Sequence, residues 1–266
     1  MDQVFNYTTT SQIDAKLQRD TLAHEDRMKK IYICIFLVLI FIFRGAIFYW
    51  LKFGIAVPYG YDERPIDVMQ EPVQTNYTEQ EQNSKKFFYK SLINGNKMEI
   101  IPQAHYVLSG KVVAFNHDFL FRSPFFDSAA LYDLGTSWGK LADKNLFKTY
   151  MKTYSSKVEM TGSRRLNWTY RLDIPLESDY INSHISHSHI VPANNNIMAA
   201  MLKIKEWDTI QIEGELVDMK FRDDKHLREY TYHTSLSRTD SDPGRGSGAC
   251  ETIYVTKVRI GNRVYK

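Results

Sequence analysis

The stretch 208–221 reads DTIQIEGELVDMKF, and it decides what kind of sheet this chain builds. Apolar residues stand at even positions up to Ile212 and at odd positions from Val217 onward. Side chains of a strand alternate between the two faces of a sheet, so a change of parity moves the apolar face to the other side. Gly214 lies at this change, and a glycine there is typical of a β-bulge or a sharp bend. The stretch therefore predicts one strongly bent strand.

Two further stretches also predict bent strands. HYVLSGKVVAF (105–115) is apolar on both faces and has Gly110 at its centre. In ETIYVTKVRI (251–260), the apolar parity shifts between Val255 and Val258. Bent strands around one helix predict an α+β, mostly β fold with a small closed or half-open barrel similar to an OB-fold.

The main helix of the body is predicted within NNNIMAAMLKIKEW (194–207), where an asparagine can cap the first turn and apolar residues form a stripe. FFDSAALYDLGTSWGKL (125–141) predicts a short helix that stops near Gly135. Further strands are predicted at 157–162, 165–172 and 230–238.

The run IYICIFLVLIFIFRGAIFYWL (31–51) predicts a transmembrane helix. It has 21 residues and a single charge, Arg44. A helix of that length rises about 30 Å, which matches the hydrocarbon core of a bilayer. Lysine and arginine are more frequent before the run than after it, and this bias predicts a cytosolic N-terminus. The basic residues before the run are Lys16, Arg19, Arg27, Lys29 and Lys30.

The composition changes along the chain predict four parts. These are a polar cytosolic tail (1–30), the membrane span (31–51), a polar linker with three prolines (52–87) and an exported globular β-rich domain (88–266). The predicted location is single-pass in a membrane, which in a bacterium would be the inner membrane with the body facing the periplasm.

The overall charge argues against nucleic acid as a partner. The formal net charge of the 266-residue chain is only +3, and its basic residues are scattered. The expected partners are therefore the membrane and possibly another protein. The chain has two cysteines, Cys34 in the apolar run and Cys250 far downstream, which excludes a disulfide-dense scaffold.

NSHISHSHIVPANNN (182–196) contains a His-x-His pair, His187 and His189. On a strand both side chains lie on one face, and two imidazoles so placed can share a zinc ion. Zinc needs at least one more protein ligand. The alternative is a polar strand whose histidines bond to the backbone or to the asparagines that follow. The candidate third ligands are His184, His117, Asp118 and His233.

The stretch SLSRTDSDPGRGSGACE (235–251) is the second candidate. Its glycines and Arg238 could hold an anion, with Asp240 as a nearby carboxylate. The alternative is a hairpin connection with solvated charges. Cys250, at the end of this stretch, could also act as a nucleophile with His187 or His189 as its base.

Two functional classes follow. The first is a membrane-anchored binding or scaffold module of an envelope assembly. The second is a membrane-anchored hydrolase, possibly metal-dependent. Its candidate catalytic residues are His187, His189, Arg238 and Asp240, with His187 and His189 as the metal ligands. The sequence leaves open whether the protein is an enzyme, and it identifies no cofactor.

Overall fold

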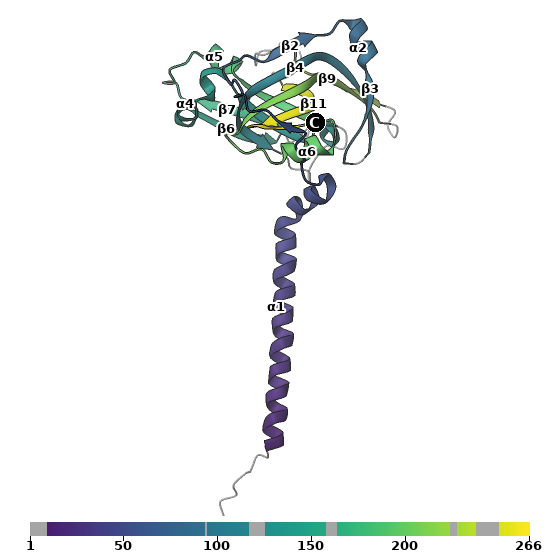
Figure 1. Cartoon of the computed structure of the whole chain (residues 1–266), viewed down its shortest axis with the longest axis vertical. Helices are drawn as coiled ribbons and strands as arrows, with labels where there is room; N and C mark the ends of the chain where they lie inside the picture. Colours follow the sequence, from purple (N-terminus) through teal and green to yellow (C-terminus); the bar gives the residue numbers. More distant parts are fainter. Residues whose placement is uncertain (1–9, 94, 117–125, 158–163, 224–227, 238–249) are drawn as a thin grey trace, which may run out of the picture. The chain divides into compact units, whose positions relative to one another are not determined.

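The computed structural model describes residues 10–93, 95–116, 126–157, 164–223, 228–237 and 250–266. The chain divides into two compact units, Met1–Lys52 and Phe53–Lys266. The described residues of the first unit belong to one long helix, α1, which begins at Thr10 and ends at Phe53 (Figure 1). The predicted span 31–51 lies within α1. Among the described residues, however, no helix combines the length and the apolar character needed to cross a membrane, so this finding does not support the predicted span.

The body is built on one ten-stranded sheet, with strands in the order β1-β12-β11-β8-β5-β4-β9-β10. Two short strands, β2 and β3, pair with different parts of β4, and β11 pairs with β9 as well as with β8. The ten strands are β1 (Gly60–Tyr61), β2 (Val73–Asn76), β3 (Phe87–Lys90), β4 (Lys97–Asn116), β5 (Tyr132–Ser137), β8 (Ile185–Pro192), β9 (Thr209–Asp223), β10 (Arg228–Tyr232), β11 (Cys250–Ile260) and β12 (Arg263–Tyr265).

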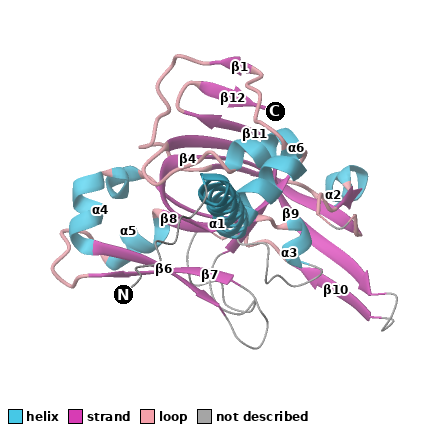
Figure 2. Cartoon of the chain, turned by 90° about the horizontal axis from the view of Figure 1, so that it is seen from below, coloured by secondary structure: helices cyan, strands magenta, loops and turns pink. Residues whose placement is uncertain are grey.

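The remaining elements surround this sheet. A separate two-stranded sheet pairs β6 (Met151–Lys157) with β7 (Arg164–Tyr170). Among the described residues of the body, the helices are α2 (Glu79–Lys85), α3 (Phe126–Ala129), the 3-10 helix η1 (Gly139–Ala142), α4 (Lys144–Tyr150), α5 (Ser178–Ser183) and α6 (Asn195–Met201). The elements α4, α5, β6 and β7 gather at one end of the body (Figure 2).

The predicted bends occur where the parity of the sequence changes. The pairing of β11 with β9 shifts register between Val255 and Lys257, so Thr256 is the extra residue of a bulge. Gly214 lies opposite this bulge, where a Cβ atom would overlap the carbonyl oxygen of Tyr254. The glycine is therefore required by the close approach of two backbones.

The α+β, mostly β class is confirmed. Of the predicted closed or half-open barrel, the closed form is wrong, because the large sheet is not closed into a barrel. The pairings link β4, β9, β11, β8 and β5 in turn and return to β4, yet the sheet as a whole does not close. The physical reason is strand length. β4 has 20 residues and β9 has 15, so both extend past this group and pair with further strands, which leaves open edges.

Three predictions about elements need correction. The short helix predicted to stop near Gly135 is wrong there, because Gly135 lies in the middle of β5, all of whose residues are buried between β4 and β8. The main helix is α6, capped by Asn194 as predicted, but it ends earlier, at Met201. The stretch 52–87, predicted as a linker, contains β1, β2 and α2. The predicted strand at 157–162 falls mostly outside the described residues.

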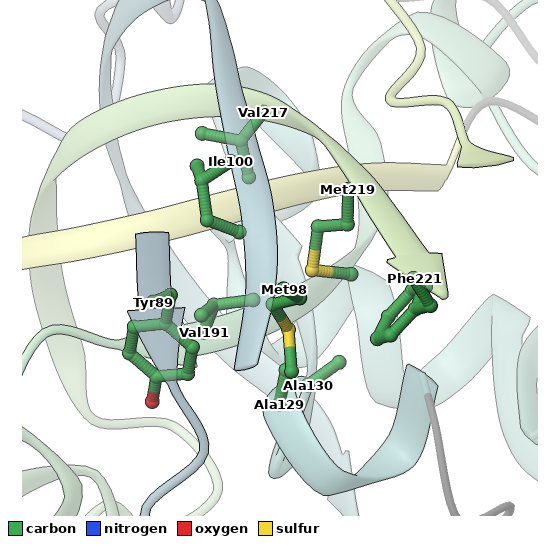
Figure 3. Packing of buried hydrophobic residues seen from close by; sticks show 9 residues of the cluster. All are labelled: Tyr89, Met98, Ile100, Ala129, Ala130, Val191, Val217, Met219 and Phe221. Carbon is green, nitrogen blue, oxygen red and sulfur yellow. The ribbon is translucent and has the colours of Figure 1, made fainter. Parts of the chain in front are cut away.

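The core includes two clusters of buried apolar residues. One cluster packs β3, β4 and β9 against α3 and β8, and its members converge on Met98 and Met219 (Figure 3). A second cluster lies beneath α4 and α5 and includes Phe147, Ile181 and Ile185. β8 contributes Val191 to the first cluster and Ile185 to the second, so the strand that carries the His-x-His pair is held rigidly between them.

Candidate functional site

The pairing of three adjacent strands assembles the site. β8 and β11 run parallel, with Cys250 beside His187 and Thr252 beside His189. β5 runs antiparallel to β8 on its other side, with Asp133 beside His189. Partners in register project to the same face of a sheet. The histidines, the cysteine and the aspartate therefore share one face.

The polar atoms of these four side chains lie close together. The Cys250 Sγ atom is 3.4 Å from Nδ1 of His187, and Nδ1 of His189 is 2.8 Å from Oδ1 of Asp133. Nε2 of His187 lies 3.9 Å from the same Asp133 oxygen. The two imidazole rings meet edge to face with centroids 4.5 Å apart. One nitrogen from each histidine and the cysteine sulfur all lie within 4.8 Å of one another.

The site is largely withdrawn from solvent. His187 is 2% exposed and Asp133 is 1% exposed, while His189 and Cys250 are half-buried. Buried charges are tolerated only where they are paired. Here Asp133 and Cys250 both face the histidines. A protonated His189 can therefore pair with the Asp133 carboxylate on one side and with a Cys250 thiolate on the other.

The pKa values follow from this arrangement. Burial alone raises the pKa of Cys250, but the neighbouring histidines overcome this and lower it to about 6. Burial alone lowers the pKa of His189, but Asp133 and then Cys250 raise it to about 10. The pKa of His187 is also raised, against burial and His189, by Asp133 and Cys250. Near neutral pH the metal-free site therefore holds a thiolate beside protonated imidazole.

Glu251 lies next to Cys250 in sequence but projects to the opposite face of β11. It is 3% exposed, and the Ser188 hydroxyl donates to its Oε2 atom at 3.4 Å. Burial raises the pKa of Glu251 to about 8. The two faces of β11 thus carry a thiol that favours its charged form and a carboxyl that favours its neutral form.

The donor atoms fit a transition metal. Nitrogen of histidine and thiolate sulfur are ligands that zinc prefers. Asp133 accepts a hydrogen bond from Nδ1 of His189, and a carboxylate in this position commonly orients a metal-binding histidine. His187, His189 and Cys250 could therefore hold the ion, with Asp133 supporting His189.

The structure brings together only part of the predicted site. His187 and His189 share one face as predicted, and Cys250 is adjacent, but Arg238 and Asp240 lie outside the described residues. Their catalytic roles stay predictions.

Of the predicted third ligands, the two that the structure describes, His184 and His233, do not join the histidine pair. His184 bonds to Glu71 through Nε2 at 2.8 Å, and His233 bonds to Asp218 through Nδ1 at 2.7 Å. His117 and Asp118 lie outside the described residues. Sequence spacing could not identify Cys250 as the third ligand. Cys250 lies 63 residues from His187 in the chain and reaches it only because β11 pairs with β8 in parallel.

Sequence reasoning missed Asp133 entirely. Its stretch was predicted as a helix, because β5 is buried on both faces and lacks the alternation of a half-exposed strand. The signal that could have found it is a lone carboxylate within an apolar run, since buried aspartates are nearly always paired.

No protein-family model matches the chain, and comparisons with curated proteins and with solved structures also gave no match. The chemistry of this site therefore has to be argued from its own geometry.

Proposed function

We propose that this protein is a metal-dependent hydrolase that binds a zinc-class divalent ion through His187, His189 and Cys250. The observation that carries the proposal is the convergence of three ligand atoms within 4.8 Å of one another on one face of the sheet. Two of these ligands come from one strand and the third from its neighbour, so the backbone itself sets their spacing.

The distance between two of the ligand atoms fits a tetrahedral ion. Zinc lies about 2.0–2.1 Å from histidine nitrogen and about 2.3 Å from thiolate sulfur. In a tetrahedron these bond lengths put ligand atoms about 3.3–3.6 Å apart. The 3.4 Å separation between Cys250 Sγ and His187 Nδ1 falls within this range.

A set of three protein ligands favours catalysis over a purely structural role. Structural zinc sites usually have four protein ligands, whereas catalytic sites have three and leave one position for water. Zinc in such a site lowers the pKa of bound water and polarises carbonyl or phosphoryl groups. Asp133 would keep Nδ1 of His189 protonated, so that the other ring nitrogen is the ligand.

The same geometry supports a second candidate function, a thiol nucleophile. Cys250, His189 and Asp133 form a series in which the carboxylate orients a histidine and the histidine faces the thiol. This is the arrangement by which cysteine enzymes activate their nucleophile. Sulfur would attack an acyl carbon, and the protonated histidine would give its proton to the leaving group.

Metal analysis of the purified full chain tests the first proposal. We expect about one equivalent of zinc per chain, and loss of that metal in His187→Ala, His189→Ala and Cys250→Ser. His233→Ala is the matched control, because His233 pairs with Asp218 outside the site. Metal at the control level in all three variants would contradict the metal site.

Hydrolysis needs its own measurement. The zinc-loaded chain should cleave activated nitrophenyl esters or phosphodiesters, and a chelator should abolish that activity. A metal-free wild type whose Cys250 reacts rapidly with iodoacetamide would favour the thiol nucleophile instead. Bound metal without any cleavage would favour the binding or scaffold module.

The single-pass anchor at 31–51, with the N-terminus in the cytosol and the body exported, also stays a proposal. What supports it is the excess of lysine and arginine before the apolar run. Reporter fusions after residue 90 test it, and a cytosolic signal from them would contradict it.

A further inference from the structure

Four exposed lysines form a stripe along η1, α4 and the start of β6. They are Lys140, Lys144, Lys148 and Lys152, one at every fourth position. Residues four apart in a helix lie on the same side, so the middle two lysines share one face of α4. We call these four residues the lysine stripe.

The interior contacts of α4 fix the direction of the stripe. Phe147 is the buried residue of this helix and packs in the second core cluster with Met151. At about 100° per residue, Lys144 and Lys148 lie on the flank of α4 next to Phe147 rather than opposite it. Both lysines are exposed there, beside the Trp207 ring that packs on Phe147.

The charge of the lysine stripe is not balanced locally. Within the described residues, no ion pair includes any of its four lysines. The nearest acid in sequence, Asp143, uses its carboxylate to accept hydrogen bonds from the backbone of Asn145 and Leu146 at the start of α4. Like charges four residues apart destabilise a helix, so a row of them indicates a role other than stability.

Aromatic rings lie between these charges. The ammonium groups of Lys144 and Lys148 lie 5.8 Å and 5.9 Å from the ring centre of Trp207, and that of Lys140 lies 5.6 Å from the ring of Tyr180. These contacts place half-buried aromatic rings among the exposed cations.

Trp207 is held in a conformation that a bulky residue rarely adopts. Its φ of 71° lies in the left-handed region, which is strained for a bulky non-glycine residue. Its backbone N–H donates to the Val112 carbonyl at 2.7 Å, and its ring packs edge-on against Phe147 at 5.4 Å. The surrounding structure therefore fixes this ring beside the lysines.

Apolar side chains are also exposed in this unit of the chain. Leu172 is fully exposed just after β7, and Met69 is 62% exposed. Met69 lines a hollow of about 560 Å³ together with Val68, Leu146, Lys140 and Asp143. The Asp143 carboxylate already accepts two backbone hydrogen bonds, so the apolar walls and the Lys140 amine are what the hollow offers to an amphiphile with an anionic head.

We propose that the lysine stripe and Trp207 dock the body onto an anionic phospholipid surface. Lysine beside tryptophan and tyrosine is the combination found at membrane interfaces, where the rings sit at headgroup level and the amines bind lipid phosphates. The exposed leucine and methionine favour lipid over nucleic acid, which offers no apolar phase to receive them. This proposal does not depend on the metal site.

Covalent labelling of lysines in the full chain tests this docking. The chain is treated with an amine-reactive ester in the presence of vesicles of phosphatidylcholine alone or mixed with phosphatidylglycerol, and labelling is read by mass spectrometry. Each lysine near such a surface contributes roughly a fivefold gain in binding, so we expect labelling of Lys144 and Lys148 to slow at least about fivefold with anionic vesicles only. Lys90 and Lys97, which are exposed on β3 and β4 across the body from α4, report the background rate (Figure 1).

A pair of charge-matched variants makes the test specific. In Lys144→Gln/Lys148→Gln, the protection of Lys140 and Lys152 should disappear, whereas Lys90→Gln/Lys97→Gln should retain it. Equal labelling of Lys144 and Lys148 with both kinds of vesicle would overturn the proposal. Protection by single-stranded DNA but not by anionic vesicles would also overturn it, because the partner would then be a nucleic acid.

Discussion

Asp133 is the residue on which the geometry of the site depends. It lies in β5, is almost fully buried and bonds to Nδ1 of His189 at 2.8 Å. It also lies 3.9 Å from His187, so one carboxylate faces both histidines. Without it, the imidazole of His189 would lose the partner that sets its tautomer and orientation.

Asp133→Asn should therefore weaken metal binding without removing a ligand. Loss of such a supporting carboxylate typically costs 10–100-fold in metal affinity, and we expect a loss of about that size. Competition with a chromogenic zinc chelator measures it. Asp218→Asn is the control, because Asp218 bonds to His233, which is not a ligand. Equal affinity in the two variants would show that Asp133 does not support the site.

Glu251 makes stability depend on pH. In the folded protein its pKa is about 8, against an ordinary value of 4.5. The folded state therefore holds this proton where the unfolded state has lost it, and stability falls as pH rises from about 4.5 to about 8. The full effect is at most about 5 kcal/mol, since each pKa unit corresponds to 1.36 kcal/mol.

Glu251→Gln should remove this dependence. Urea unfolding in the presence of EDTA, at several pH values between about 5 and 8, gives the free energy of unfolding for both proteins. We expect the advantage of the variant over the wild type to grow steadily as pH rises. Curves that stay parallel across this range would contradict a raised pKa.

At the scale of elements, the contact between β9 and β11 shapes the body. β11 pairs with β8 on one side and with β9 on the other, and the bulge at Thr256 lies opposite Gly214. The bulge lets one strand change the face that carries its apolar residues while staying paired. This bend lets β11 carry Cys250 beside β8 at one end and pair with β12 at the other.

Gly214→Ala should be clearly destabilising. The added methyl group would overlap the backbone of Tyr254, and a backbone cannot move aside as a flexible side chain can. Overpacking of this kind typically costs about 1–3 kcal/mol, and the loss should appear as a lower urea midpoint. Gly60→Ala is the matched control, because nothing lies within 4 Å of a Cβ at that position. If Gly214→Ala were as stable as Gly60→Ala, the backbones of β9 and β11 could move apart at little cost in free energy.

At the scale of the whole molecule, the segment after α1 belongs to the body. Val57 donates its N–H to Asn196 at 2.8 Å, and β2 pairs along β4. The buried guanidinium of Arg259 donates to the carbonyl oxygens of Asp62 and Arg64. These contacts come from widely separated parts of the chain, and together they tie residues 57–76 to the large sheet.

Limited proteolysis of the full chain should therefore leave a fragment that begins near Phe53, where the second compact unit starts. The sequence alone predicted a start near residue 88. N-terminal sequencing of the protected fragment separates the two starting points. A fragment beginning near residue 88 would show that β1, β2 and α2 are loosely held.

Local patterns in the sequence determined much of the β structure. Alternation with a change of parity identified the strands at 208–221 and 251–260, because the period of two is a property of a single strand. In 251–260 the parity change also located the bulge at Thr256. The cap at Asn194 and the shared face of His187 and His189 were readable for the same reason. Each of these features depends on residues that are close together in the chain.

Only the tertiary structure decided which strands are neighbours. The sequence predicted a closed or half-open barrel without deciding between them, and the lengths of β4 and β9 leave the sheet open. β5 was taken for a helix because a strand buried on both faces does not alternate. The same pairings decided the site. Cys250 reaches His187 through a parallel strand pair, and Asp133 reaches His189 through an antiparallel one. No spacing in the sequence records these contacts, because they arise when long-range strand pairing buries the apolar faces together.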